Sequence, residues 1–469
     1  MSLPADVHYL TISEIAPLIA DGSVSPVELT EAMLARIAAL DPKLNAYALV
    51  TADLARQQAG EAAREIAAGQ YRGPLHGVPI ALKDLVYTKG IRTTGGSAVF
   101  DDFLPDFDAT VVRKLAAAGA VLLGKLNMTE GAMGGYHPAL RFPENPWRES
   151  HWPGASSSGS GTATAAGMAF ATLGSDTGGS IRHPAAVCGV VGLKPTWGRV
   201  SRHGIMPLAA SLDHIGPLTR SARDAAIVLQ AISGTDDADP TSLPHEVPDM
   251  LAGVGQGVGS LRIGYDERYT FEDMEPSFAQ AVADGVRMLE SLGARIVPVR
   301  MPERLRDYVA AWPTICGAEG AAAHAATYPF RADDYGPFFR EWLRRGAAFS
   351  ATEYAQAHEL RLNCNGEFRK LMREVDMLAC PATPKAAYPV TADVHYGPIP
   401  SDRDPWTGRF TVPHDYAGLP TITLPAGLTS DGLPAALQLV GHHLSEPLLV
   451  QAAVAFEDAT DFHTLHPPL

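Results

Sequence analysis

Two glycine- and serine-rich segments near the middle of the chain decide its fold. Residues 152–161 have the sequence WPGASSSGSG, and residues 173–182 have the sequence LGSDTGGSIR. A run of glycine and serine is typical of a flexible linker between domains. Here, however, apolar segments lie on both sides of each run, within an alternation of strand and helix patterns. We therefore interpret the two segments as turns of a folded core that pack against each other.

Short apolar runs around these turns predict a buried β-sheet. We expect strands at 78–82, 120–123 and 168–173, with a helical pattern at 109–118 between two of them. Such alternation is typical of a parallel sheet with helices on both faces. The expected fold class is therefore α/β: a single large domain with a central mixed, mostly parallel β-sheet covered by helices.

The N-terminal part of the chain predicts two helices. Ser25 provides an N-cap and Pro26 a first helical residue, and Pro42 should end this helix at Asp41 because a proline disfavours the α conformation of its predecessor. A second, alanine-rich helix should cover 52–67.

The C-terminal half is more irregular. Helical patterns occupy 277–292 and 351–375, a strand should return to the sheet at 375–380, and 419–456 predicts a strand, a turn, a strand and a helix. We divide the single domain, residues 1–469, into N-terminal helices (1–70), a core (71–235), a variable cap and substrate region (236–375) and a C-terminal part that returns to the core sheet (376–469).

Composition excludes several classes of function. The chain has 469 residues, 46% hydrophobic and 19% charged, which is a globular composition, and its net charge of −15 argues against binding to nucleic acid or anionic lipid. We see no signal peptide and no apolar run long enough to span a membrane, and we expect a cytoplasmic protein. The cysteines are too scattered for a disulfide framework or a zinc site: Cys188, Cys316, Cys364 and Cys380.

The second glycine-rich segment has the composition of a catalytic turn. Residues 176–180 follow a buried strand, and glycines let successive backbone N–H groups point at one developing oxyanion while Ser180 attacks. A serine needs a base at neutral pH. Lys83 is a candidate because a lysine at the end of a buried strand loses affinity for its proton. From these residues alone, a lysine that leaves the strand for solvent remains the alternative.

Histidine is the more usual base, but none of the 16 histidines stands out by motif. Four of them lie in or near the core segments, and we interpret them as packing or surface residues: His76, His137, His183 and His214.

Several long motifs resemble the amidase signature family. They are GPLHGVPIALKD at 73–84, GKLNMTE at 124–130, the serine-rich turn at 154–159, GGSIRHP at 178–184 and DHIGPLTR at 213–220. The resemblance covers roughly residues 10–235 and 375–460. It implies the fold of that family and cleavage of a carbon–nitrogen bond in an amide, a carbamate or an aryl amide.

The resemblance also implies the site residues. The family uses a Ser–cis-Ser–Lys triad and a covalent acyl-enzyme, which assigns Ser180 as nucleophile, Ser156 as the bridging serine in a cis peptide, and Lys83 as the base. Neither a metal nor a cofactor takes part. The implied oxyanion donors are Thr177, Gly178 and Gly179, and the implied supporting residues are Ser157, Asp176 and Arg182.

The substrate is less well defined by the resemblance. The family's usual turn is Gly-Gly-Ser-Ser-Gly-Gly, whereas Ala155 and Ser158 add side chains here. The expected substrate-binding residues are Met133, Gly134 and Tyr136, with Trp147, Trp152 and Cys316 as lesser candidates. Apolar and aromatic residues in this region favour a neutral, apolar or aryl acyl group.

Three functions follow from these observations. The favoured one is a stand-alone hydrolase of a small-molecule amide or carbamate. The second is the glutaminase subunit of a tRNA-dependent amidotransferase, for which a glutamine-binding arginine would be expected among Arg340, Arg344 and Arg361. The third is an inactive family member that acts as a binding module. We expect neither nucleic acid nor a membrane as a partner, and the oligomeric state, including a homodimer, is left open.

Overall fold

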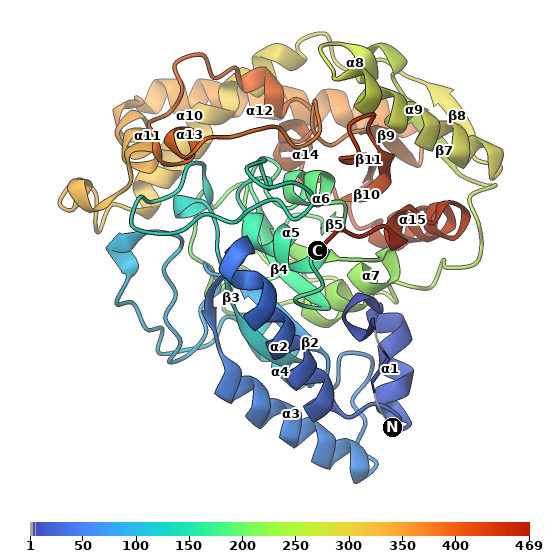
Figure 1. The fold of residues 1–469 in the computed structure, drawn as a ribbon. Coiled ribbons are helices and arrows are strands. Elements are labelled where there is room, and N and C mark those ends of the chain that lie inside the picture. The colour runs from blue at the N-terminus through green and yellow to red at the C-terminus, as the bar shows by residue number, and fades with distance from the viewer. Residues whose placement is uncertain (1–2, 5) are drawn as a thin grey trace.

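An eleven-stranded β-sheet runs through the computed structural model, which describes residues 3–4 and 6–469 (Figure 1). The strand order is β1-β3-β2-β4-β6-β5-β10-β11-β9-β7-β8. The strands are β1 (Tyr47–Val50), β2 (Pro79–Lys83), β3 (Val121–Leu126), β4 (Ala171–Asp176), β5 (Val191–Lys194), β6 (His214–Thr219), β7 (Arg262–Tyr265), β8 (Arg295–Pro298), β9 (Met377–Pro381), β10 (Thr421–Leu428) and β11 (Pro434–Gly441).

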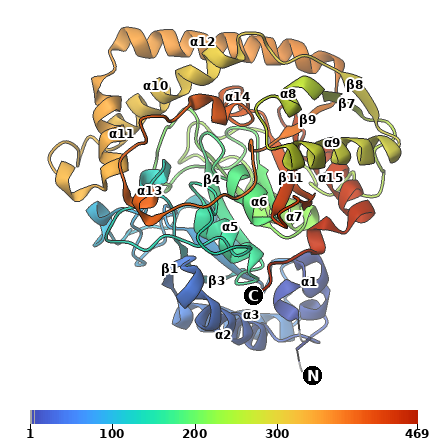
Figure 2. The same cartoon turned by 45° about the horizontal axis from the view of Figure 1, so that its top comes forward.

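Helices cover both faces of this sheet (Figures 1 and 2). They are α1 (Ile12–Ala20), α2 (Pro26–Leu44), α3 (Ala52–Ala67), α4 (Thr110–Ala117), α5 (Ser158–Ala165), α6 (Arg182–Cys188), α7 (Ala222–Ile232), α8 (Glu267–Phe271), α9 (Pro276–Ser291), α10 (Leu305–Ala323), α11 (Pro337–Ala348), α12 (Ala351–Leu371), α13 (Ala392–Tyr396), α14 (Val412–Tyr416) and α15 (Glu446–Thr460).

The pairing of the strands confirms a mixed sheet but corrects the predicted share of parallel pairs. β2 pairs in parallel with β3 and β4, and β7 pairs in parallel with β8 and β9. The other six pairs are antiparallel, so the expectation of mostly parallel pairing is wrong. A parallel pair needs a long crossover, whereas a short turn such as the one between β10 and β11 joins antiparallel strands.

The central strands are buried on both faces. Every residue of β2, β3 and β4 is buried, and this explains why apolar residues follow one another in β2 and at the start of β3 instead of alternating with polar ones. β4 begins at Ala171 and extends to Asp176, so it starts and ends three residues later than the predicted strand 168–173. The glycine-rich turn therefore begins at Thr177, directly at the carboxyl end of β4.

The predicted end of the first long helix is wrong. α2 begins at the N-cap Ser25 as expected, but it continues through Pro42 to Leu44. Leu44 is buried, and the helix ends only where Asn45 adopts a left-handed conformation and its N–H donates to Asp41 O at 2.8 Å. Packing of this last turn outweighs the loss of one backbone hydrogen bond at the proline.

The segment 236–375 divides into two parts. β7 and β8 extend the sheet at one edge, and α9 lies between them in the sequence. α11 and α12 both pack on α10, and the three helices lie at the end of the molecule opposite to α2 and α3 (Figures 1 and 2). The second part, which we call the cap, covers the turn that follows β4, because the Trp312 side chain of α10 lies against Gly178.

Candidate active site

Lys83 is the last residue of β2 and is completely buried. Its Nζ lies 2.6 Å from Ser156 Oγ, 2.9 Å from Ser157 Oγ and 2.8 Å from Ser175 Oγ. Burial lowers the pKa of Lys83 to about 7, an effect that the more distant Asp176 and Asp213 oppose only in part. A large fraction of this amine is therefore neutral at physiological pH.

Of the three hydroxyls that bond to Lys83 Nζ in the described residues, that of Ser175 was not predicted from the sequence. It lies on β4, which pairs in parallel with β2, and this pairing brings its hydroxyl to Nζ. The signal was its position beside Asp176 at the end of a buried strand, but only the strand register shows that it faces Lys83.

The serine-rich turn is tied to its neighbours through the backbone. The peptide between Ala155 and Ser156 is cis, and Ser156 is completely buried. Thr129 N–H donates to Ser156 O and Ser157 N–H donates to Ser180 O, each at 3.2 Å. The two glycine- and serine-rich segments therefore lie side by side, as the sequence predicted.

Ser180 lies in the turn after β4 and is partly exposed. No hydrogen bond of its hydroxyl to any other described residue is present, so this oxygen is free to meet a ligand.

The N–H groups of the turn are not equivalent. Gly179 N–H donates to Asp176 Oδ1 at 2.6 Å, and Ile181 N–H donates to Asp176 Oδ2 at 2.9 Å. The N–H groups of Thr177, Gly178 and Ser180 donate to no other group in the described residues. Of the three expected oxyanion donors, Thr177 and Gly178 are thus available, while Gly179 is already engaged by the carboxylate that shapes the turn.

A buried ion network supports this turn from behind. Arg182 Nη2 lies 2.8 Å from Asp176 Oδ1 and 2.5 Å from Asp415 Oδ2, and all three side chains are inaccessible to solvent. Burial alone would raise the pKa of Asp176, but Arg182 holds it well below its usual range. For Asp415 burial prevails and raises the pKa to about 8. One guanidinium therefore holds one firmly ionised carboxylate.

Replacement of this arginine should destabilise the protein. We expect Arg182→Met to lower the free energy of unfolding by about 3–5 kcal/mol at pH 7, because it leaves Asp176 buried and unpaired. The pKa of Asp176 is depressed, so this contribution is present at neutral pH and is lost only as the pH falls through the acidic range. Urea unfolding measures it, with Arg344→Met, which breaks an exposed pair with Glu341, as the control. Equal midpoints for both variants would contradict the expectation.

The histidines set aside in the sequence analysis do not hydrogen-bond to Lys83 or to the catalytic candidates Ser156 and Ser180 within the described residues. His183 lies beneath Gly179, and burial lowers its pKa to about 4. His214 is buried behind the turn, where Nδ1 lies 3.2 Å from Asp176 O. His76 pairs with Glu65, and His137 contacts the backbone of Asp334.

A cavity of about 370 Å³ opens beside the turn. α10, α11 and the loop 399–408 form its walls, and Gly178 and His183 lie at the catalytic end. Trp312 Nε1–H donates to Thr177 O at 3.0 Å, and a Cβ on Gly178 would approach the Trp312 ring to 2.8 Å. Residue 178 must therefore be a glycine while this tryptophan is in place.

The residues expected to bind substrate do not line this cavity. Met133 and Tyr136 are buried, and Tyr136 N–H donates to His395 O at 2.8 Å. Gly134 is half-buried and lies against the Phe338 ring of α11. This loop therefore packs against the cap instead of lining the cavity.

The lesser candidates are also not among the residues that line the cavity. Trp147 donates to Cys188 O, Trp152 packs near His183 and Tyr388, and Cys316 is completely buried.

The proposed glutamine-binding arginines are engaged with other groups: Arg340 with Asp333, Arg344 with Glu341, and Arg361 with Ser211 and Tyr416 O. Four residues that line the cavity belong to no sequence motif and were not predicted: Trp312, Trp342, Arg345 and Arg403.

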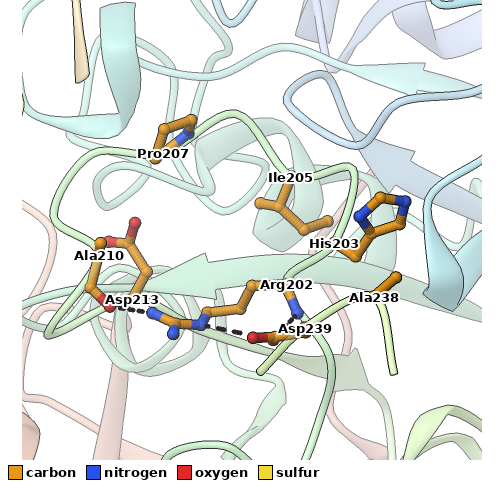
Figure 3. Close-up of a pocket in the computed structure, with 8 residues that line it drawn as sticks. All are labelled: Arg202, His203, Ile205, Pro207, Ala210, Asp213, Ala238 and Asp239. Atoms are coloured by element: carbon orange, nitrogen blue, oxygen red, sulfur yellow. Dashed lines mark hydrogen bonds and ion pairs between the residues drawn. The ribbon is translucent and has the colours of Figure 1, made fainter. Parts of the chain in front are cut away.

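A second cavity, of about 220 Å³, lies on another side of the turn (Figure 3). Asp213 forms part of it and accepts a hydrogen bond from Thr177 Oγ1 at 2.6 Å, so this carboxyl positions the turn. The side chain of Arg202 is already engaged by Ala210 O and Asp239. We therefore assign this cavity a structural role.

The described residues include no group of three or more side chains that could hold a metal ion. None of the helices in the described residues combines the length and the apolar character needed to cross a membrane.

Comparison with known proteins places the whole chain in one family. The family model described as "Amidase" matches residues 28–450. The "Putative amidase AmiD" of Mycobacterium tuberculosis (strain H37Rv) is 45% identical over 99% of this chain and 97% of its own. A glutamyl-tRNA(Gln) amidotransferase subunit from Geobacter sp. (strain M21) is 40% identical over 99% of this chain and 100% of its own. The native peptide amidase of Stenotrophomonas maltophilia superposes with a TM-score of 0.84 at 34% identity, over 96% of this chain and 97% of its own.

Proposed function

This chain belongs to the amidase family and is an amide-hydrolysing enzyme, and from that premise we propose that Ser180, Ser156 and Lys83 carry out the cleavage. The observation that carries the proposal is the environment of Lys83. A fully buried amine lies among three serine hydroxyls, and no carboxylate of the described residues forms an ion pair with it. Burial without a carboxylate partner favours the neutral form of the amine, and an adjacent hydroxyl can give it a proton.

The hydrogen bonds of the three hydroxyls suit a neutral lysine. A neutral amine has two N–H donors and one lone pair, which matches three hydroxyl partners. Ser157 Oγ–H donates to Ser175 O at 3.2 Å, so Ser157 accepts from the amine. Ser156 Oγ has no other partner among the described residues, and its proton is therefore available to the lone pair of Nζ.

The proposed reaction begins with a transfer of two protons. Ser180 Oγ attacks the amide carbonyl, its proton passes to Ser156, and the Ser156 proton passes to Lys83 Nζ. The N–H groups of Thr177 and Gly178 stabilise the oxyanion that develops on the carbonyl oxygen. When the tetrahedral intermediate collapses, the proton returns through Ser156 to the leaving amine and an acyl ester of Ser180 remains. Water then attacks this ester by the same relay and releases the acid.

The Asp176–Arg182 pair supports this chemistry indirectly. Asp176 accepts hydrogen bonds from the N–H groups of Gly179 and Ile181. This fixes the backbone of the turn, and with it the direction of the N–H groups of Thr177 and Gly178. Because the donors are already oriented, little reorganisation is needed when the negative charge appears.

The second candidate, a glutaminase subunit, draws on the resemblance to the amidotransferase relative. The arginines that the sequence offered for glutamine are bound to other groups, so we favour the stand-alone amidase.

Covalent capture tests the proposal. A fluorophosphonate should add one phosphonyl group to Ser180, which mass spectrometry of a proteolytic digest would locate, and activity should fall in proportion. Dialysis against EDTA should leave activity unchanged, because the proposed steps use only side chains and N–H groups of the chain. Labelling of another serine that tracks the loss of activity would contradict the assignment. So would loss of activity in EDTA that a divalent ion restores.

A further inference from the structure

The lining of the cavity beside Gly178 includes basic residues but no acidic residue. Arg345 and Arg403 are among its lining residues, and no aspartate or glutamate is. The protein as a whole has a net charge of −15, so a purely basic cavity is not a consequence of average composition. His183, the remaining titratable lining residue, is neutral because burial lowers its pKa to about 4.

Arg403 has no partner within the described residues. Its guanidinium forms neither a hydrogen bond nor an ion pair with them, and it lies 5.4 Å from the centre of the Phe338 ring. Asp402 and Asp404 flank Arg403 in the sequence, but neither forms an ion pair with it in the described residues. Asp404 accepts from Trp406 N–H at 2.9 Å and lies 4.0 Å from Arg306. Arg403 is a solvent-exposed residue of the loop 399–408. Nearby protein atoms lower its pKa, but an arginine remains charged.

Arg345 offers a ligand less uncompensated charge than Arg403 does. It donates to Glu341 Oε1 at 2.7 Å and its side chain is half exposed, so its charge is largely compensated at the rim. Arg403 is therefore the lining arginine whose charge is available to a ligand anion, because a guanidinium without a protein partner offers two parallel donors to one carboxylate.

We propose that the substrate of this enzyme carries a carboxylate that Arg403 binds while the amide lies at Ser180. This inference rests on the proposed function and specifies its substrate class. Gly178 and Arg403 line the same cavity, so the amide and the carboxylate belong to one small molecule. Trp312 and Trp342 line the cavity with their rings 5.8 Å apart and provide apolar contact for the part that joins the two ends.

The lining also argues against a substrate with a free amino group. An ammonium such as that of glutamine would find the unpaired guanidinium of Arg403 and no carboxylate among the lining residues. The class that fits is an acidic amide without an amino group, such as the monoamide of a dicarboxylic acid. This class differs from the neutral acyl group that we expected from the sequence. That expectation used the apolar and aromatic residues of the cap, whereas the lack of a partner for Arg403 is evident only in the structure.

Matched substrates test the inference. Succinamate, glutaramate and adipamate are compared with butanamide, pentanamide and hexanamide, in which a methyl group replaces the carboxylate, and glutaramate is compared with glutamine, which adds only the amino group. For the best chain length, we expect kcat/KM of the acid to exceed that of its methyl partner by roughly ten- to a hundredfold. Glutamine should be the poorer substrate of its pair, and the preference for the acid should decrease with ionic strength.

Variants assign the preference to the arginine. Arg403→Gln should reduce the ratio of acid to methyl partner by at least tenfold, mainly through KM, and Arg403→Lys should retain part of it. Arg344→Gln, which alters a surface arginine of α11 outside the cavity, should leave the ratio unchanged.

The outcomes separate this inference from the proposed function. Equal turnover of acid and methyl partners, or an equal loss of both in Arg403→Gln, would overturn the role of Arg403 while the amidase mechanism stands. Hydrolysis of these amides that persists in Ser180→Ala would overturn the mechanism itself. A preference for glutamine over glutaramate would contradict the proposed class and favour the glutaminase alternative.

Discussion

Ser180→Ala should lower kcat/KM by roughly 10⁴-fold or more while the fold survives. Removal of a nucleophile ends covalent catalysis, and the remaining rate comes from binding and the oxyanion donors. The Ser180 hydroxyl forms no hydrogen bond to the other described residues and the side chain is partly exposed, so its loss should change the free energy of unfolding by less than about 0.5 kcal/mol. Steady-state kinetics and urea unfolding of the same preparation measure both effects.

Ser160→Ala is the matched control for this experiment. Ser160 belongs to the serine-rich segment and is completely buried, but its hydroxyl donates to Leu173 O at 3.1 Å and not to Lys83. We expect near-normal activity with a stability loss of about 1 kcal/mol. A Ser180→Ala protein with near-normal activity, or a Ser160→Ala protein without any, would contradict the assignment of the nucleophile.

The second large effect concerns the base. For the wild-type enzyme kcat/KM should rise with pH through about 7 and reach a plateau above it. The sign follows from the chemistry: burial lowers the pKa of Lys83 from 10.5 to about 7, and only the deprotonated amine, which predominates above that pH, can accept the Ser156 proton. Lys83→Met should lower kcat/KM by roughly 10²–10⁴-fold and remove the pH dependence near 7.

The assignment of that pH dependence needs the variant as well as the wild type. Asp213 lies behind the turn, and burial raises its pKa to about 6, so it titrates in a neighbouring range. Lys114→Met is the control, because this partly buried lysine donates to Ser233 O and lies outside the site. A flat profile between pH 5 and 9 in the wild type, or an unchanged inflection near 7 in Lys83→Met, would show that another group is the base.

Much of the fold was predictable from short-range patterns. Buried strands leave continuous apolar runs, and those at 78–82 and 120–123 overlap with β2 and β3. The predicted helix at 52–67 coincides with α3. The expectations that were wrong depended on contacts distant in sequence. Packing of Leu44 carries α2 past Pro42, and the order of the strands, which sets how many are antiparallel, is decided by which edges meet in three dimensions.

The sequence by itself determined the family and the catalytic candidates Lys83, Ser156 and Ser180. Each lies at the end of a strand or in a tight turn, where local residue types dictate the backbone and leave a recognisable motif. Only the tertiary structure decided that Ser175 faces Lys83, that Gly179 N–H is engaged by Asp176, and that the cavity is formed by α10, α11 and the loop 399–408. The physical reason is that the pairing or isolation of a polar group, like that of Arg403, depends on atoms brought together by packing, and no local pattern records them.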